Sequence, residues 1–270
     1  MVRFPGSKNS THHHPADPLL YTELLPTVWC HGCGIGTTVH AFIQALKDSS
    51  VEPKKVCVVS GLGCTGKIST YIKLRSHSAP YGNVVGRAAE LKKENPHWHV
   101  VVFLNNADFL LTGARDFIDE AQKGTDLMVL YINNFLYTLN KTQAFPMSPF
   151  IRKSVDGKFD LPFNIPHLAK TYGARYVARW TPLQSGWLKH SLSEALFKRE
   201  FGVIEVVSPC LMFSCDEGRI QDAGEKMKFY DDRSEFCYGE NTENLDLRKE
   251  GKIRVGLFIE SGRPLQEDHS

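Results

Sequence analysis

The sequence predicts an α/β fold with a mainly parallel sheet flanked by helices. Two observations support it: short continuous apolar runs rich in β-branched residues, and amphipathic stretches of helical spacing between them. Strands that are apolar on both faces are typical of a parallel sheet buried between helices. Regular alternation of strand and helix produces such a layered sheet.

The predicted elements follow in chain order. A helix is expected over residues 38–47, where Val39, Phe42, Ile43 and Leu46 recur at helical spacing. Apolar runs then predict strands at residues 56–60, 100–104, 127–132 and 203–207, with a shorter one at 176–178. Helices are expected between them at residues 112–122 and 183–198. These elements fall within residues 21–215, which we expect to form one α/β domain.

The two ends of the chain differ from this pattern. Residues 1–20 are polar and contain three prolines, so we expect a flexible arm. Residues 216–270 are rich in charge, and only residues 253–259 resemble a strand. We interpret 216–270 as a C-terminal extension that wraps a neighbour or covers the sheet.

Composition excludes several classes of function. Lys and Arg number 32 against 30 Asp and Glu, so no charge excess favours nucleic acid as a partner. No apolar run reaches the roughly 18–20 residues of a membrane span, and the first residues lack the apolar region of a signal peptide. We therefore expect a cytoplasmic protein, in which cysteines are more often thiols or metal ligands than disulfides.

Four of the seven cysteines stand at informative places. Cys30 and Cys33 form a C-x-x-C pair directly before a predicted helix, while Cys64 and Cys210 each follow a predicted strand. The carboxyl ends of parallel strands share one sheet edge, so these thiols can converge there. The residues alone leave several readings open: a redox pair, a zinc ion, a [4Fe–4S] cluster, or buried Cys64 and Cys210 side chains in the core.

Residues 61–66 match the G-x-G-x-x-G pattern of dinucleotide-binding loops. That pattern also needs an acidic residue about 20 positions later, which binds the ribose. Residues 67–86 contain no Asp or Glu. A nicotinamide or flavin site is therefore disfavoured.

Taken together, these motifs resemble the β subunit of 2-oxoacid:ferredoxin oxidoreductases, the subunit that binds thiamine diphosphate. The resemblance covers residues 28–217 and rests on four blocks in the family's order: Trp29-Cys30-His31-Gly32-Cys33-Gly34, Gly61-Leu62-Gly63-Cys64-Thr65-Gly66, Ile132-Asn133-Asn134-Phe135-Leu136-Tyr137 with Gln143 following, and Ser208-Pro209-Cys210. It implies the fold of a thiamine-diphosphate-binding domain. It also implies that Cys30, Cys33, Cys64 and Cys210 hold a [4Fe–4S] cluster.

The resemblance further implies the oxidative decarboxylation of a 2-oxoacid. The acyl group would pass to coenzyme A, and electrons would leave through the cluster to ferredoxin or another carrier. The cofactor would supply the carbon chemistry, and the protein would bind and orient it. Activity would need an α subunit with the pyrimidine domain, in a heterodimer or a dimer of heterodimers. No catalytic residue of this chain can be assigned from the sequence.

The sequence departs from the family where the diphosphate and Mg²⁺ are bound. The family's G-D-G-D reads Asn105-Asn106-Ala107-Asp108, its H-G-R reads Tyr81-Gly82-Asn83, and its T-G-G-Q reads Asn140-Lys141-Thr142-Gln143. The metal-binding aspartate is thus Asn106, a neutral ligand where Mg²⁺ prefers an anionic oxygen. Asn134 and the Leu136 carbonyl, the other expected Mg²⁺ contacts, are retained, and Asp108 is a candidate substitute.

Three hypotheses follow. In the first, the chain is a divergent working subunit whose Mg²⁺ is held by Asn106, Asn134 and the Leu136 carbonyl, with Lys141 meeting the diphosphate near Tyr81, Gly82 and Gln143. In the second, thiamine diphosphate binding has been lost and the chain is an iron–sulfur electron-transfer or scaffold subunit of a larger complex. In the third, it is an α/β domain without a cofactor.

Overall fold

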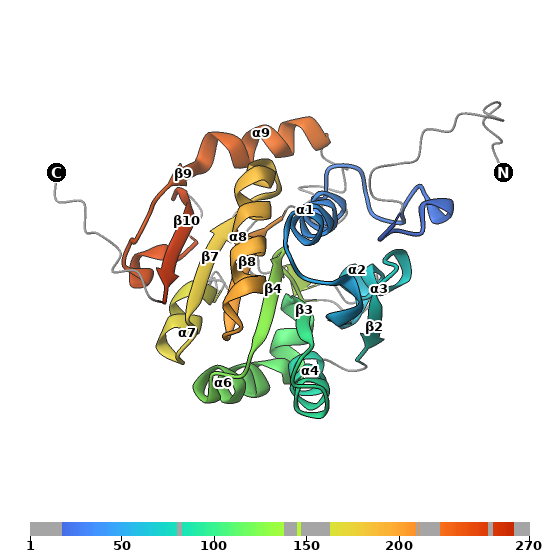
Figure 1. Ribbon diagram of the computed structural model, residues 1–270. Coiled ribbons are helices and arrows are strands. Elements are labelled where there is room, and N and C mark those ends of the chain that lie inside the picture. Colours follow the sequence, from blue (N-terminus) through green and yellow to red (C-terminus); the bar gives the residue numbers. More distant parts are fainter. Residues whose placement is uncertain are drawn as a thin grey trace, which may run out of the picture.

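A computed structural model describes residues 18–79, 83–137, 145–146, 163–208, 210, 222–247 and 251–261. An eight-stranded sheet runs through the molecule in the order β2-β1-β3-β4-β8-β7-β10-β9 (Figure 1). Neighbouring strands of this sheet are parallel, except that β10 is antiparallel to β7. The predicted mainly parallel α/β fold is therefore confirmed.

The strands of the sheet are β1 (Val56–Ser60), β2 (Arg75–Ser78), β3 (His99–Asn105), β4 (Leu127–Asn133), β7 (Tyr176–Trp180), β8 (Gly202–Val207), β9 (Ser234–Phe236) and β10 (Ile253–Glu260). A separate antiparallel pair consists of β5 (Leu136–Tyr137) and β6 (Phe145–Pro146). The main helices are α1 (Ile35–Asp48), α4 (Val84–Glu94), α6 (Ala114–Lys123), α7 (Ile165–Thr171), α8 (Ser185–Lys198) and α9 (Ala223–Arg233). The short helices α2 (Gly63–Gly66), α3 (Ile68–Tyr71) and α5 (Asn106–Asp108) follow strand ends.

Every strand predicted from an apolar run is present in the main sheet. The strand predicted at 56–60 is β1, those at 100–104 and 127–132 are β3 and β4, and those at 176–178 and 203–207 are β7 and β8. The strand predicted at 253–259 is β10. β2 was not predicted because its four residues, Arg75–Ser78, are polar, as suits an edge strand with exposed and half-exposed side chains.

The three predicted helices are present, each with a shifted start. The helix expected at 38–47 is α1, which begins three residues earlier, at Ile35. The helix expected at 183–198 begins at Ser185, because Thr181 and Gln184 form a reciprocal capping box around the short turn Pro182–Gln184. The helix expected at 112–122 begins at Ala114, after a π-helical turn at Phe109–Gly113.

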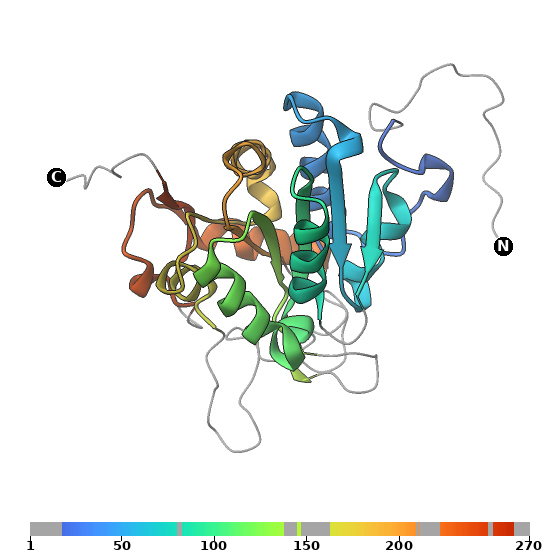
Figure 2. The same ribbon diagram turned by 60° about the horizontal axis from the view of Figure 1, so that its bottom comes forward.

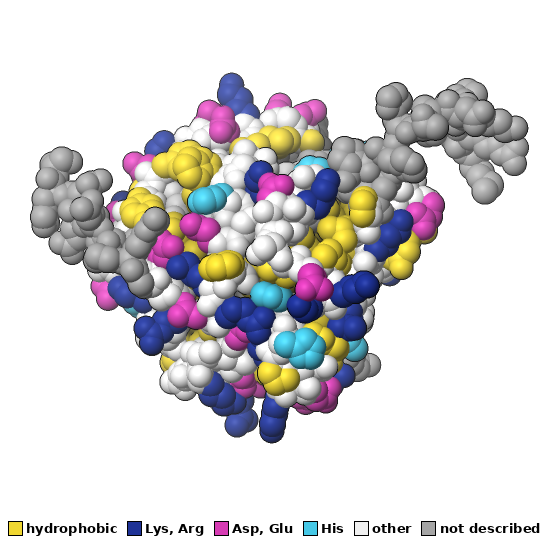
Figure 3. All heavy atoms as spheres, viewed as in Figure 1, with side chains coloured by type: hydrophobic (Ala, Val, Ile, Leu, Met, Phe, Trp, Pro, Cys, Tyr) yellow, Lys and Arg dark blue, Asp and Glu magenta, His cyan; other side chains and the backbone are white. Residues whose placement is uncertain are grey.

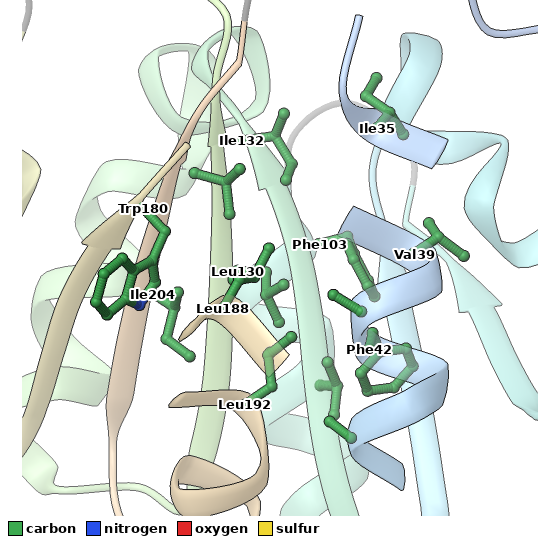
Figure 4. Close-up of a cluster of buried hydrophobic side chains, with 14 of the residues drawn as sticks. Ile35, Val39, Phe42, Phe103, Leu130, Ile132, Trp180, Leu188, Leu192 and Ile204 are labelled. Carbon is green, nitrogen blue, oxygen red and sulfur yellow. The ribbon is translucent and has the colours of Figure 1, made fainter. Parts of the chain in front are cut away.

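Helices cover both faces of the sheet (Figures 1 and 2). α1 and α8 lie on one face, and α4, α6 and α7 lie on the other. In Figure 4, Phe42 of α1 and Leu192 of α8 point toward the sheet, where Phe103 and Leu130 meet them. The Phe42 and Phe103 rings pack edge to face with centroids 5.5 Å apart. Burial of these apolar faces fixes where each strand ends.

The C-terminal part of the chain completes the sheet. β10 pairs with β7 and continues the sheet to β9. At the other end of the chain Leu19 is buried, and Leu20 forms a bridge to Ile72, so packing begins within the last residues of the predicted arm. Among the described residues, no helix is long and apolar enough to cross a bilayer.

Candidate functional site

The carboxyl edge of the sheet carries most of the residues singled out by sequence. α2 and α3 follow β1, α5 follows β3, and Asn134 follows β4. Ser208 and Cys210 follow β8. Because β1, β3, β4 and β8 are adjacent and parallel, these segments emerge side by side.

The four candidate cysteines come from three segments that are tied together by hydrogen bonds. The indole nitrogen of Trp29, one residue before Cys30, donates to the Cys64 carbonyl at 2.9 Å. The hydroxyl of Ser208 donates to the Cys33 carbonyl. This bond joins the Cys30–Cys33 segment to the end of β8, which Cys210 follows. These bonds hold the three segments in one region.

The other three thiols are within electrostatic reach of Cys33. Burial raises the pKa of the Cys33 thiol to about 11, and the neighbouring thiols of Cys30, Cys64 and Cys210 act in the same direction. Cys30 and Cys64 are exposed, whereas Cys210 is half-buried and Cys33 is buried. Within the described part of the chain, no three His, Cys, Asp or Glu side chains are placed to hold a single metal ion.

Gly34 sets the geometry between the cysteine pair and α1. Its φ of 84° is left-handed, and a Cβ atom there would lie 2.2 Å from Cγ of Pro182 and 2.7 Å from the Ser208 hydroxyl. Only glycine fits this close approach without strain. Close packing therefore explains why the residue after Cys33 is a glycine.

The remaining cysteines lie elsewhere. Cys57 lies inside β1 and is buried, as its place in an apolar run predicted. Cys237 is half-buried near β9. Cys215 lies outside the described residues.

The loop that carries Cys64 is anchored to the end of β3. The Asn105 amide donates to the Leu62 carbonyl at 3.0 Å and to the Thr65 hydroxyl at 2.7 Å. Its oxygen accepts the backbone N–H of Asp108 at 2.9 Å, which caps α5. These hydrogen bonds connect the ends of β1 and β3.

Asp108 is a buried carboxyl group in this anchor. One oxygen accepts the Leu62 N–H at 3.2 Å, and the other has no hydrogen-bond partner among the described residues. Burial raises the pKa of Asp108 to about 6, and the backbone bonds from Leu62 and Asn105 only partly oppose this. A Cβ atom on Gly61 would lie 2.0 Å from the unpartnered oxygen, so glycine is needed here too.

Asn106 belongs to a chain of buried polar groups that sequence reasoning missed. Its amide nitrogen donates to the Asn133 oxygen at 2.9 Å, and its own oxygen accepts the Asn134 N–H at 3.1 Å. Asn133 in turn donates to Glu205 at 2.6 Å, and Glu205 pairs with Arg179 at 2.5 Å. We call these four side chains, Asn106, Asn133, Glu205 and Arg179, the amide–carboxylate relay.

A signal for the relay existed in the sequence. Glu205 lies inside the apolar run predicted as the strand at 203–207, and Arg179 directly follows the short run predicted at 176–178. Opposite charges inside two buried strands must be paired. Their partnership became visible only with the register, in which Arg179 stands opposite Glu205.

The other expected cofactor residues are only partly described. Leu136 begins β5, directly after Phe135, whose left-handed φ of 59° turns the chain there. Tyr81, Gly82, Lys141 and Gln143 lie outside the described residues, so the structure does not relate them to the site.

A separate cavity of about 310 Å³ lies between α8 and the end of the sheet formed by β9 and β10. Its lining includes four large aromatic side chains, Trp180, Trp187, Phe236 and Tyr238, and the two tryptophan rings stack with centroids 6.0 Å apart. Figure 3 shows hydrophobic side chains gathered on the surface near β9. None of the predicted site residues lines this cavity.

Comparison with known proteins gives consistent matches. Residues 61–206 match the family model described as thiamine pyrophosphate enzyme, C-terminal TPP binding domain. The 2-oxoglutarate synthase subunit KorB of Methanothermobacter marburgensis is 33% identical over 249 residues, covering 91% of this chain and 87% of that protein. The protein of the same name from Archaeoglobus fulgidus is 38% identical over 194 residues, covering 71% and 72%.

A solved structure shares the fold. It is the 2-oxoglutarate:ferredoxin oxidoreductase from Magnetococcus marinus with 2-oxoglutarate, coenzyme A and succinyl-CoA bound, and it superposes with a TM-score of 0.75. The match covers 93% of this chain and 86% of that chain at 21% identity.

Proposed function

Because the chain belongs to the β subunits of 2-oxoacid:ferredoxin oxidoreductases, enzymes in which this subunit acts with a partner, we propose that it converts a 2-oxoacid to an acyl-CoA. A 2-oxoacid and coenzyme A would give acyl-CoA, CO₂, a proton and a pair of electrons. The names of its relatives make 2-oxoglutarate the first substrate to test. We propose a cytoplasmic heterodimer with an α subunit, or a dimer of heterodimers, with ferredoxin or another carrier as electron acceptor.

The observation that supports the proposal is that the thiols of Cys30, Cys64 and Cys210 all lie within electrostatic reach of Cys33, on three segments joined by hydrogen bonds at the carboxyl edge of the sheet. Their donor chemistry fits a [4Fe–4S] cluster, in which each thiolate binds its own iron. Cys33 lies on the protein side of the group, while Cys30 and Cys64 face solvent, where a carrier can approach. We assign Cys30, Cys33, Cys64 and Cys210 as the ligands.

The residues of the β3 and β4 ends fit a divalent cation and a diphosphate less closely. Asn106 and Asn134 supply amide oxygens and Leu136 a carbonyl, all hard ligands that suit Mg²⁺. An amide oxygen has two lone pairs, so the bond from the Asn134 N–H does not by itself prevent Asn106 from binding a cation. Asp108, two residues after Asn106, is our candidate for the missing negative charge, because one of its buried oxygens has no hydrogen-bond partner among the described residues.

Thiamine diphosphate would supply, when bound, the carbon nucleophile for decarboxylation, and a cluster held by the four cysteines would supply a one-electron acceptor. This chain contributes binding and orientation. Asn106, Asn134 and the Leu136 carbonyl would hold Mg²⁺, and Tyr81, Gly82, Lys141 and Gln143 would face the diphosphate. Lys141 would offset the charge that Asn106 lacks.

The decisive measurement is thiamine diphosphate bound per iron in the anaerobically purified native complex. The proposal expects close to one thiamine diphosphate for each cluster of this subunit, and turnover with 2-oxoglutarate or another 2-oxoacid. Iron without thiamine diphosphate, even after incubation with the cofactor and Mg²⁺, would overturn the proposed activity.

The alternative is an iron–sulfur electron-transfer or scaffold subunit without thiamine diphosphate. One observation favours it: both ends of the Asn106 amide are engaged by Asn133 and Asn134. The two functions predict different responses to Asn134→Ala. The working enzyme loses activity because a Mg²⁺ contact is removed, whereas an electron conduit tolerates the change.

The cluster assignment has its own test. Cys33→Ala should abolish the brown colour and most of the bound iron, because one of four thiolates is removed. Cys57→Ala is the matched control: it removes another buried thiol, from strand β1, and should retain iron. Unchanged iron in Cys33→Ala would refute the assignment, and colourless protein with stoichiometric zinc would indicate a zinc site.

A further inference from the structure

Glu205 is a fully buried carboxylate for which the proposed chemistry has no use. It pairs with Arg179, and both side chains are 0% exposed. Arg179 also donates to the Leu245 carbonyl at 2.7 Å. A buried ion pair stabilises a fold no better than well-packed apolar side chains of similar size. The pair therefore calls for a role other than stability.

The second oxygen of Glu205 determines how Asn133 is oriented. A carboxylate can only accept hydrogen bonds, so it selects the NH₂ end of the Asn133 amide, which donates to it at 2.6 Å. The oxygen of Asn133 is thereby turned toward the end of β3. There it accepts a bond of 2.9 Å from the amide nitrogen of Asn106.

The orientation of Asn106 follows from the same rule. With its NH₂ group turned to Asn133, its oxygen is turned to the backbone N–H of Asn134 at 3.1 Å. Asn106 and Asn133 are buried, so water does not compete for these bonds. The Glu205 carboxylate thus favours the observed direction of both amides, in the same sense as the backbone N–H groups of Phe135 and Asn134, which donate to the Asn133 oxygen at 3.4 Å and to the Asn106 oxygen at 3.1 Å.

We propose that Glu205 is a positioning residue that acts through Asn133 to hold the Asn106 amide with its oxygen toward the Asn134 N–H, at the strand ends where we place the candidate Mg²⁺ ligands. The inference rests on the proposed function for its consequence, cofactor binding. The orientation itself is a property of this chain alone. Where a neutral amide replaces a metal-binding carboxylate, its direction decides whether the cation meets an oxygen or an NH₂ group.

Two variants break the relay in different ways. Glu205→Gln lets the neighbouring amide adopt either direction, because a glutamine both donates and accepts. Asn133→Leu removes the link while leaving the ion pair between Arg179 and Glu205 in place. Val203→Ala is the matched control: it truncates another buried side chain of β8 that lies outside the relay.

The first readout needs no cofactor. Hydrogen–deuterium exchange of the Asn134 amide, in the full chain complexed with its partner subunit, reports the bond to Asn106. Exchange should accelerate roughly tenfold in both relay variants, the equivalent of one lost hydrogen bond, and stay near the wild-type rate in Val203→Ala. Equal acceleration in all three variants, or none in the relay variants, would overturn the inference.

The second readout is the affinity for thiamine diphosphate with Mg²⁺. We expect roughly a tenfold loss in Glu205→Gln and in Asn133→Leu, and no further loss when Asn133→Leu is added to Asn106→Ala. Additive losses would contradict action through Asn106. If the wild-type complex binds no thiamine diphosphate, the proposed function fails, while the exchange measurement still decides whether Glu205 orients the amides.

Discussion

Gly34 offers a sharp test of how the cysteine segments are held together. In Gly34→Ala the new methyl group would lie 2.2 Å from Cγ of Pro182 and 2.7 Å from the Ser208 hydroxyl, at a φ of 84°. The left-handed backbone costs roughly 1–2 kcal/mol, and overpacking against a rigid proline ring adds about 1–3 kcal/mol. Losing the bond from Ser208 to the Cys33 carbonyl adds about 1 kcal/mol.

The expected destabilisation is therefore about 4 kcal/mol, which lowers Tm by roughly 12 °C in a chain of this size. Thermal unfolding and iron per chain would be measured on the same preparation, because displacement of Ser208 should also separate Cys33 from Cys210. Gly186→Ala, in α8, is the matched control, because no described residue outside the local helix backbone lies within 4 Å of the new methyl group. It should leave Tm unchanged or raise it slightly. If Gly34→Ala keeps both Tm and iron close to wild type, the close packing inferred at Gly34 is refuted.

Three further predictions concern other parts of the fold. Burial raises the pKa of Asp108 from 3.8 to about 6, so the cofactor-free protein should lose about 3 kcal/mol of folding free energy as pH rises through this interval. In urea titrations at pH 4 and pH 7, Asp108→Asn should abolish that loss. Equal pH dependence in both proteins would contradict the prediction. Asp126 accepts bonds from Lys92 at 2.5 Å and from Arg199 at 2.7 Å, and Lys92 is almost buried. Asp126→Ala should lower the free energy of unfolding in urea by about 3 kcal/mol. Glu52→Gln, which removes an exposed ion pair with Lys55, should change that free energy little. Gly256→Ala would place a methyl group 1.7 Å from the Cys237 carbonyl and should separate β9 from β10. Because Trp187 packs on Phe236 of β9, this separation should change the fluorescence of Trp187. An unchanged fluorescence spectrum would argue against the prediction.

The sequence predicted the sheet well because its central strands are buried on both faces. In a strand such as β4 every residue is buried and all but the last, Asn133, are apolar or aromatic, so the run is readable without a structure. β2 could not be read this way because it lies at the edge, where polar side chains meet solvent. β9 has only three residues and is defined by its partner β10.

The candidate site was predictable only in part, for a related reason. Cys64 and Cys210 were placed at one edge because each follows an apolar run, and parallel strands share their carboxyl edge. The role of Glu205 depends on the register between strands and on which amide faces which, and neither is encoded in local spacing. Its charge inside an apolar run was a clue, but its partner Arg179 is 26 residues away in the chain.

The antiparallel β10 has a consequence for synthesis. It covers the edge of β7, and Glu260 at its end pairs with Tyr176, 84 residues earlier in the chain. Until the ribosome has delivered residues 253–260, β7 presents an open row of backbone donors and acceptors to any other nascent strand. Chains that stall or are cleaved before this point should be prone to aggregation, and a chaperone that shields sheet edges would act in that interval.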